Sequence, residues 1–312
     1  MTRPLVVAAA QVGPVARVDK RPEVVERLVT LLGEAAAGGA QLVVFPELTL
    51  TSFFPRWWMD ADELATFFDA EVPGPSTEAL FSEARRLGVG VALGYAEVTT
   101  DGHHYNTTVL VDTDGRVVTR YRKVHLPGHE DHEPWRPFQH LERAYFEPGP
   151  AGFATHRAFG GVVGLATCND RRWPETYRVL GLQGAELILI GYNTPIHYPP
   201  DPDQDHLAGF HNNLVMAAGA YQNGAFVVGV AKCGLEEGVA SLAESQIIAP
   251  SGEVVAQAVT DGDEVVLTEI DLDVCAHYKA TLFDFDRYRR PDAYGLITSQ
   301  RGATPPPEMR PV

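Results

Sequence analysis

Three widely separated side chains of this chain, Glu47, Lys123 and Cys168, together have the chemistry that acyl transfer requires. A cysteine nucleophile needs a base for its proton, and a carboxylate can serve if burial raises its pKa toward neutrality. Attack on a carbonyl builds negative charge on oxygen, which a nearby ammonium stabilises. A carboxylate, an ammonium and a thiol are therefore sufficient, without histidine or metal.

Each of the three also has an ordinary interpretation, and the residues alone leave both open. Most free cysteines are buried and inert, so Cys168 would then be a core residue. Glu47 would be a helix cap or a surface carboxylate, and Lys123 the solvated end of a strand. Arg171 and Arg172 favour the catalytic interpretation, because they suit an anion better than a core.

The segment around Cys168 predicts a strand followed by a helix. Residues 162–167 form an apolar run bounded by glycine, which is typical of a buried strand, and Pro174 with Glu175 indicates the first turn of a helix. Ligands of open α/β sheets bind at this kind of strand end. The dipole at the helix N-terminus would also favour the thiolate form of Cys168.

Other polar side chains also follow predicted strands. Glu47 comes after a strand at 41–45, and Lys123 ends the second arm of a hairpin at 105–124. Asn193 and Thr194 follow a strand at 185–191, where they could hydrogen-bond a polar group of a ligand. The sequence does not show that these strand ends meet.

The remaining pattern predicts an α/β protein with two sheets covered by helices, in one domain spanning 1–304 with a mobile tail at 305–312. We expect Ser76 to cap a helix at 76–87, and Asp205 to cap one that runs to about 222. Further strands are expected over 5–11, 89–98, 225–231, 241–249, 253–258 and 264–270, and further helices over 22–37 and 274–282. The packing face of the helix after Asp205 is expected to comprise Leu207, Phe210, Leu214, Ala217 and Tyr221.

Composition excludes several classes of function. The 312 residues are 45% hydrophobic and carry a net charge of −16, which argues against nucleic-acid and anionic-membrane surfaces. The three cysteines, Cys168, Cys233 and Cys275, are too widely spaced for a disulfide framework or a CxxC metal pair. With no signal peptide or apolar span evident, we expect a cytoplasmic protein.

Four histidines, His125, His129, His132 and His140, lie close together in the sequence and raise a metal site as a rival hypothesis. Prolines and a glycine interrupt this segment, so no helix could align histidines four residues apart. We therefore expect no metal. His129 and His132 are expected in solvent, whereas His211 could reach a pocket or satisfy a buried hydrogen bond.

Three segments resemble the signature segments of the nitrilase superfamily: Phe45–Glu47, Tyr121–Pro127 and Cys168–Glu175. The run from Cys168 to Thr176 is similar to that of the N-carbamoyl-D-amino-acid amidohydrolases (D-carbamoylases) of this superfamily. Similarity to the same group extends over 46–48, 53–57, 136–142 and 191–195. The likeness runs from the first strand to about residue 297.

This resemblance implies an αββα sandwich, no metal or organic cofactor, and subunits that pair through outer helices as a homodimer or homotetramer. It makes Glu47 the general base, Cys168 the nucleophile and Lys123 the stabiliser of the oxyanion, with Glu142 positioning lysine and substrate. The implied substrate-binding residues are His125, His140, Asn169, Arg171, Arg172, Asn193 and Thr194. Of these, the two arginines would form a fork on a substrate carboxylate, or one would pair with Asp170 or Glu175 instead.

The expected activity is hydrolysis of N-carbamoyl-D-amino acids to the D-amino acid, carbon dioxide and ammonia. The alternative activities are those of a 3-ureidopropionate hydrolase, a carbamoyl-polyamine hydrolase or an aliphatic amidase. The alternative from a different class is a binding module on the same fold that has no catalytic activity. The handedness of the substrate rests on the resemblance alone. The expected partner is thus a small molecule, not a nucleic acid or a membrane.

Overall fold

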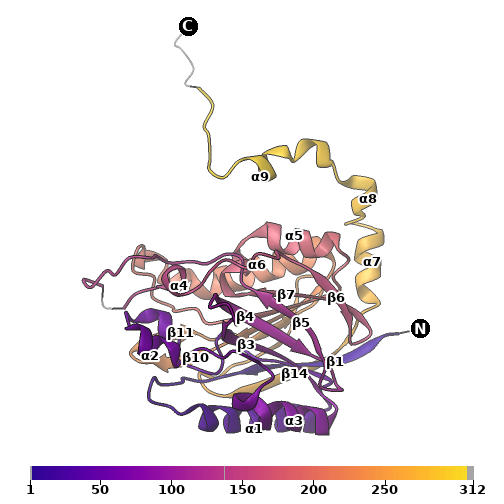
Figure 1. Cartoon of the computed structure of the whole chain (residues 1–312). Coiled ribbons are helices and arrows are strands. Elements are labelled where there is room, and N and C mark those ends of the chain that lie inside the picture. The colour runs from indigo at the N-terminus through magenta and orange to yellow at the C-terminus, as the bar shows by residue number, and fades with distance from the viewer. Residues whose placement is uncertain (1, 137, 308–312) are drawn as a thin grey trace.

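Two six-stranded mixed sheets stack face to face and are enclosed by helices in the computed structural model, which describes residues 2–136 and 138–307 (Figure 1). The first sheet has the order β14-β1-β2-β3-β4-β5. Its strands are β1 (Pro4–Gln11), β2 (Leu42–Val44), β3 (Gly90–Val98), β4 (His104–Val111), β5 (Val117–Arg122) and β14 (Glu264–Asp271). This arrangement confirms the predicted αββα class.

The second sheet has the order β13-β12-β9-β8-β7-β6, and its three central strands run parallel. Its strands are β6 (Thr155–Ala158), β7 (Gly161–Thr167), β8 (Leu187–Tyr192), β9 (Phe226–Ala231), β12 (Gln246–Ile248) and β13 (Val254–Gln257). A separate hairpin joins β10 (Cys233–Glu236) and β11 (Val239–Leu242).

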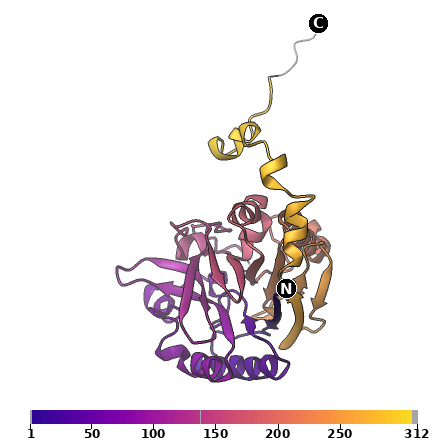
Figure 2. The same ribbon diagram turned by 90° about the vertical axis from the view of Figure 1, so that its right-hand side faces the viewer.

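Four long helices cover the outer faces. Figures 1 and 2 show α1 (Arg21–Ala37) and α3 (Glu78–Leu87) on one side, with α5 (Pro174–Leu182) and α6 (Ala208–Asn223) on the other. Short helices and 3-10 turns fill the loops: α2 (Ala61–Ala65), α4 (Glu142–Tyr145), η1 (Phe54–Arg56), η2 (Pro75–Thr77), η3 (Cys168–Arg172) and η4 (Pro202–Leu207).

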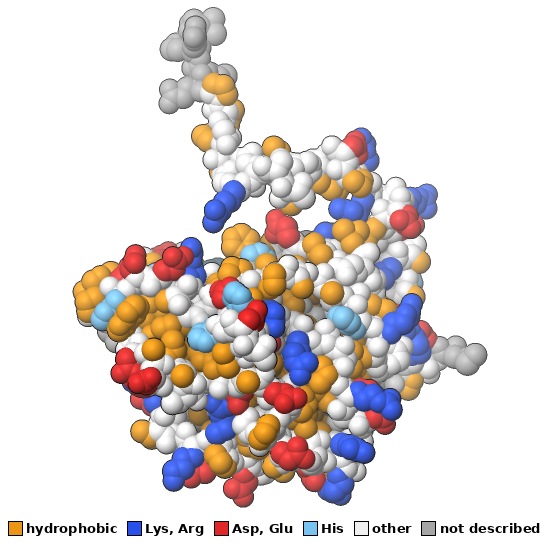
Figure 3. All heavy atoms as spheres, in the orientation of Figure 1, with side chains coloured by type: hydrophobic (Ala, Val, Ile, Leu, Met, Phe, Trp, Pro, Cys, Tyr) orange, Lys and Arg blue, Asp and Glu red, His pale blue; other side chains and the backbone are white. Residues whose placement is uncertain are grey.

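Helix α7 (Val274–Ala280) packs on the body, with Cys275 fully buried and Lys279 Nζ donating to Gly184 O at 3.1 Å. Beyond it the C-terminal segment leaves the body as an arm that contains α8 (Phe285–Tyr288), η5 (Pro291–Ala293) and α9 (Gly295–Ser299). Hydrophobic side chains lie exposed along it, among them Leu282, Tyr288, Leu296 and Ile297 (Figure 3). Of the predicted tail, 305–307 carry no helix or strand, and 308–312 lie outside the described residues. Among the described residues, no helix has the length and apolar character needed to cross a membrane.

Alternation along the strands divides the core into layers. In β1, Val7 and Ala9 face the second sheet, whereas Ala8 and Ala10 pack against α1. β8 shows the same pattern: Leu187 and Leu189 lie between the sheets, and the intervening isoleucines face α5 and α6. Because both faces of these strands are buried, their sequences are apolar throughout.

Most predicted elements are confirmed within a few residues, but two local predictions were wrong and one strand was missed. Ser76 does not cap α3, which begins after Thr77; its hydroxyl donates to Asp69 instead. The strand expected over 241–249 is interrupted at Ala243 and Glu244, whose φ angles are +57° and +65°. The hairpin strand β10 was not anticipated.

The predicted packing face of α6 is also wrong. Phe210, Leu214 and Tyr221 are 61%, 48% and 39% exposed. The face that packs on the second sheet instead comprises small and polar residues around Met216: Asn212, Gly219, Ala220 and Asn223. Asp205 is not the cap, because α6 begins after Leu207.

Candidate active site

The ammonium of Lys123, which follows β5, is completely buried between two carboxylates. Its Nζ donates to Glu47 Oε1 at 2.7 Å and to Glu142 Oε2 at 2.5 Å. Glu47 follows β2, and Glu142 begins α4. The interpretations of Glu47 as a surface carboxylate and of Lys123 as a solvated strand end are therefore excluded.

Burial and the neighbouring charges push the two carboxyl groups in opposite directions. Burial raises the pKa of Glu47, although Lys123 opposes the rise. Burial would also raise the pKa of Glu142, but Lys123 and His140 outweigh it and hold that pKa below its usual range. Burial would lower the pKa of Lys123, yet the surrounding negative groups raise it. Glu47 is thus the member of the cluster best suited to accept a proton.

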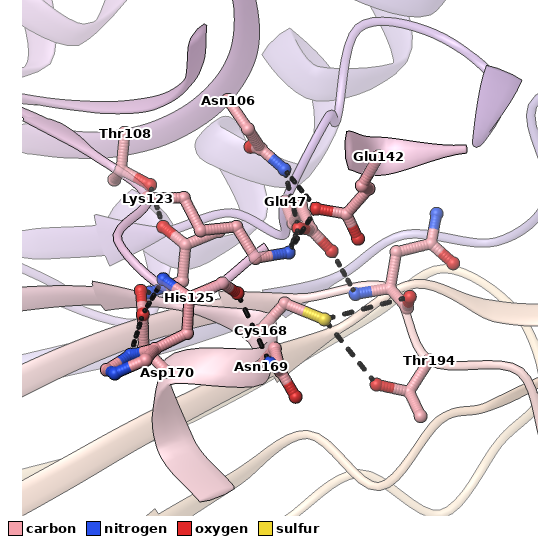
Figure 4. Close-up of polar contacts among 12 residues, drawn as sticks. Glu47, Asn106, Thr108, Lys123, His125, Glu142, Cys168, Asn169, Asp170 and Thr194 are labelled. Carbon is pink, nitrogen blue, oxygen red and sulfur yellow. Dashed lines mark hydrogen bonds and ion pairs between the residues drawn. The ribbon is translucent and has the colours of Figure 1, made fainter. Parts of the chain in front are cut away.

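Cys168 lies where β7 gives way to η3, with a φ of +47°. Non-glycine residues rarely adopt this left-handed conformation, and such strain is concentrated at functional sites. Its Sγ is 3.9 Å from Asn193 O and 3.8 Å from Thr194 Oγ1, and its residue surface is 6% exposed. Figure 4 shows the sulfur, the Lys123 ammonium and the Glu47 carboxylate directed toward one space.

Asn193, at the end of β8, connects the acid to the thiol. Its backbone N–H donates to Glu47 Oε2 at 3.0 Å, while its carbonyl oxygen faces the Cys168 sulfur. The three side chains that the sequence singled out for acyl transfer, Glu47, Lys123 and Cys168, are therefore brought into one cluster from both sheets.

The expectation of a thiolate at Cys168 is not met. Burial raises the pKa of the thiol, and the charge of Glu47 adds to this effect, while Lys123 and Arg171 oppose it. The helix α5 begins only at Pro174, beyond the η3 turn, so its N-terminus does not start at the sulfur. A buried thiol beside a carboxylate of raised pKa needs that carboxylate as its base.

Two glycines let the sheets close on Glu47. A Cβ at Gly94 of β3 would lie 2.5 Å from Pro46 O and 2.7 Å from Glu47 Cα. A Cβ at Gly191 of β8 would lie 2.7 Å from Glu47 N. Because these contacts are with backbone, a side chain at either position would push Glu47 away from Lys123 and Asn193.

Asp170 organises the turn after Cys168. It is fully buried and accepts hydrogen bonds from Tyr121 Oη at 2.6 Å, Thr167 N at 3.0 Å and His125 N at 2.9 Å. His125 Nδ1 also lies 2.8 Å from Asp170 Oδ1. Asn169 Nδ2 donates to His125 O at 3.2 Å. These contacts place His125 and Asn169 beside the nucleophile, and they engage Asp170 without an arginine.

The two arginines do not form a joint fork. Arg171 is buried under the nucleophile: it donates to Cys168 O at 2.8 Å, Thr194 Oγ1 at 2.9 Å and Asn212 Oδ1 at 2.9 Å. Arg172 has an exposed residue surface, yet burial of its guanidinium lowers its pKa and the charge of Arg171 adds to this effect, with no carboxylate of the described residues among the causes. The structure therefore separates the predicted pair into a buried support and a free surface cation.

The histidines also divide into two groups. His140 Nε2 lies 3.0 Å from Glu142 Oε1, next to the lysine. His129 Nδ1 contacts Asp131 O, and exposed His132 stacks on Trp58. His211 is exposed on α6, so it does not satisfy a buried hydrogen bond. No group of three or more His, Cys, Asp or Glu side chains among the described residues is arranged to hold a metal ion.

Some residues of the cluster were not anticipated from the sequence. Asn106 of β4 donates to Glu47 Oε1 at 2.7 Å and to Glu142 Oε2 at 3.4 Å. Thr108, on the same strand, contacts Thr167 Oγ1 at 3.0 Å and so joins the two sheets. The available signal was the polar run 106–108 inside an otherwise apolar strand.

The surroundings of the cluster include an aromatic segment, and two surface hollows lie elsewhere on the molecule. Phe53 and Phe54 belong to a buried core cluster, Trp57 is half-buried and Trp58 is exposed. Two surface hollows of about 360 and 480 Å³ share Arg157 and are lined by none of the predicted site residues. Chemically, the cluster combines a thiol, a buried base and an ammonium suited to an oxyanion.

Comparison with known proteins supports this chemistry. The Carbon-nitrogen hydrolase family profile matches residues 6–280. An N-carbamoylputrescine amidase of Arabidopsis thaliana is 30% identical over 288 residues, covering 89% of each chain. An (R)-stereoselective amidase of a Pseudomonas species is 33% identical over 251 residues, covering 80% of this chain and 79% of the relative.

The fold has a close match among solved structures. A carbon-nitrogen hydrolase from Helicobacter pylori G27 superimposes with a TM-score of 0.82 at 22% identity, covering 96% of this chain and 99% of the other. Together with the sequence match over residues 6–280, this means that the chain belongs to the carbon-nitrogen hydrolase family, the nitrilase superfamily.

Proposed function

We propose that this enzyme hydrolyses N-carbamoyl-D-amino acids. Glu47 takes the proton of Cys168 as the sulfur attacks the ureido carbon, and the resulting oxyanion is stabilised by Lys123. The tetrahedral intermediate collapses to a thioester, and Glu47 returns the proton to the departing ammonia. Glu47 then activates water, which releases an N-carboxy amino acid; this product loses carbon dioxide.

The observation that carries the substrate assignment is the free guanidinium of Arg172. It is exposed, follows the nucleophile by four positions and is not paired with a carboxylate in the described residues. Arginine is well suited to bind carboxylates, and a substrate carboxylate would supply the missing partner. Arg171 would contribute by supporting the Cys168 turn, since its donors already have neutral acceptors.

The handedness of the proposed substrate is supported by the name of a relative. One relative is named an (R)-stereoselective amidase, and most D-amino acids have the R configuration. The competing candidate is a carbamoyl-polyamine hydrolase, because relatives from several plants are named N-carbamoylputrescine amidase. A cationic substrate would leave Arg172 without a role. A 3-ureidopropionate hydrolase, an aliphatic amidase and a silent binding module have no comparable feature in their favour.

Ammonia release distinguishes these candidates. We would assay the wild type on the D and L forms of N-carbamoyl-phenylalanine, on N-carbamoylputrescine, 3-ureidopropionate and propionamide, with Cys168→Ala as the matched control. The proposal expects the D-carbamoyl amino acid to have the highest kcat/KM and the control to be inactive. A preference for the L form refutes the handedness, and a preference for N-carbamoylputrescine refutes the substrate class.

We also propose that the enzyme is a homodimer that pairs through α5 and α6. The support is an exposed apolar surface on these helices, Val179, Leu182, Phe210, Leu214 and Tyr221, beside an arm that extends away from the body. Apolar patches of this kind mark protein interfaces. Light scattering should give twice the chain mass for the wild type and a monomer for Phe210→Glu with Leu214→Glu. A monomeric wild type would refute the pairing.

A further inference from the structure

A second buried charge cluster lies behind the active site and has no part in the chemistry described above. It consists of Arg56 of η1, Glu236 of β10 and Lys232, all less than 3% exposed. Glu236 Oε1 accepts from Arg56 Nη1 at 3.1 Å, and Oε2 accepts from Lys232 Nζ at 2.8 Å. Backbone N–H groups of Phe53 and Val15 also donate to this carboxylate.

The cluster contains two cations and one carboxylate, so Arg56 has donors to spare. Its Nε has no partner among the described residues. Its Nη2 lies 3.5 Å from Asn193 Oδ1, at the long end of hydrogen bonding. The active-site cluster has the opposite formal net charge, because it contains the carboxylates of Glu47 and Glu142 and the single ammonium of Lys123. Asn193 lies between the two clusters and contacts both.

We propose that Arg56 is a positioning residue that fixes the side-chain amide of Asn193, so that Asn193 Nδ2 donates to an acceptor oxygen of the substrate. A guanidinium carries only donors, so the amide atom that faces it must be Oδ1. Nδ2 of Asn193 then points away from Arg56. It is buried and has no partner within the described part of the chain.

The backbone of Asn193 lies beside the reacting atoms. The same residue donates its N–H to Glu47 Oε2 and directs its carbonyl oxygen toward Cys168 Sγ. A buried donor without a partner carries a desolvation cost, which a substrate oxygen would relieve. The site therefore selects a carbonyl or carboxylate oxygen at this position and disfavours an ammonium. This inference rests on the proposed function only in that the site binds a linear amide.

Lys232 provides the matched control. It shares burial, charge and the Glu236 carboxylate with Arg56, but its other contact is Thr51 O, not Asn193. On N-carbamoyl-D-phenylalanine, Arg56→Met should raise KM at least tenfold, whereas Lys232→Met should leave KM within twofold despite a lower Tm. If both variants raise KM equally, Arg56 is merely structural and the proposal is overturned.

A double-mutant cycle tests whether Arg56 acts through Asn193. In an Asn193→Ala background, Arg56→Met should have no further effect on KM; an unchanged tenfold effect would contradict the proposal. If the methionine variants do not fold, the Asn193→Asp variant provides a second test. It retains the shape and gains an ion pair with Arg56, but it presents an acceptor to the substrate. We expect a KM at least tenfold higher without loss of Tm, and an unaltered KM would overturn the proposal.

Two further measurements separate this inference from the substrate assignment. If the wild type does not hydrolyse the carbamoyl amino acid, the proposed substrate fails, and the same variants are compared on propionamide. A neutron structure of the wild type locates the amide deuterium atoms of Asn193 without any substrate. Deuterium on the atom that faces Arg56 would overturn the proposal, whatever the enzyme hydrolyses.

Discussion

Replacing Lys123 with methionine should destabilise the protein in a manner that depends on pH. The ammonium is buried and contacts Glu47 at 2.7 Å and Glu142 at 2.5 Å. Without it, the two carboxylates would share a dry site with no cation between them. Like charges at such a distance cannot both remain ionised, so one carboxyl group takes up a proton.

The loss of stability follows from the free energy needed to keep that carboxyl group protonated. Holding a glutamate neutral at pH 7, against its ordinary pKa of about 4.3, costs about 3.7 kcal/mol at 1.36 kcal/mol per unit. Removing one partner of a buried ion pair typically costs about 3–5 kcal/mol, which agrees. At pH 5 the same arithmetic gives only about 1 kcal/mol. In the variant, the folded-state pKa exceeds the unfolded value, so the folded state binds the extra proton and its stability falls as pH rises.

Urea unfolding of wild type and Lys123→Met at pH 5 and pH 7 measures this difference. Lys232→Met is the matched control, because it removes an equally buried ammonium but leaves Glu236 paired with Arg56. The control should lose stability with little change between the two pH values. The reasoning is refuted if the loss in Lys123→Met is the same at pH 5 and pH 7, or is below about 1 kcal/mol at both.

Three further predictions concern activity. Gly191→Ala should lower kcat at least a hundredfold, because its Cβ would meet the Glu47 backbone, whereas Gly33→Ala, with nothing within 4 Å, should be neutral; equal rates would contradict the packing argument. Arg172→Ala should raise KM for N-carbamoyl-D-phenylalanine about 10- to 100-fold, as expected for a lost charged hydrogen bond, but leave KM for propionamide unchanged. Because the pKa of Glu47 is raised and the base must be ionised, kcat/KM should fall as pH drops through a value above that of an ordinary glutamate; a titration near pH 4 would exclude Glu47 as the base.

Most strands and helices could be predicted because their patterns are local. The run before Cys168 is apolar on both faces of β7, which is what a central strand between two helical layers requires. The prediction of the packing face of α6 was wrong for a physical reason. The amphipathic pattern of Phe210, Leu214 and Tyr221 identifies an apolar face but not what covers it, and here the protein's own core takes the opposite face.

The identity of the clustered residues could be predicted in part, but their contacts could not. Glu47, Lys123 and Cys168 were singled out by chemistry and position at strand ends, and nothing in their spacing gave a distance. The contrast between Arg171 and Arg172 shows the limit. Adjacent identical residues on a 3-10 turn point in different directions, so one is buried against Tyr192 and the other is exposed. Asn106 was missed because the polar run 106–108 did not show which of its residues contacts Glu47.

The junction between the two stacked layers has a consequence for how the enzyme would fail. Glu47 and Lys123 are carried by one layer, Cys168 and Asn193 by the other, and the Thr108–Thr167 contact crosses between them. Neither layer alone holds a competent nucleophile, so a chain that has formed its strands but has not yet brought the layers together is inert. Turnover therefore reports whether the two layers are packed against each other.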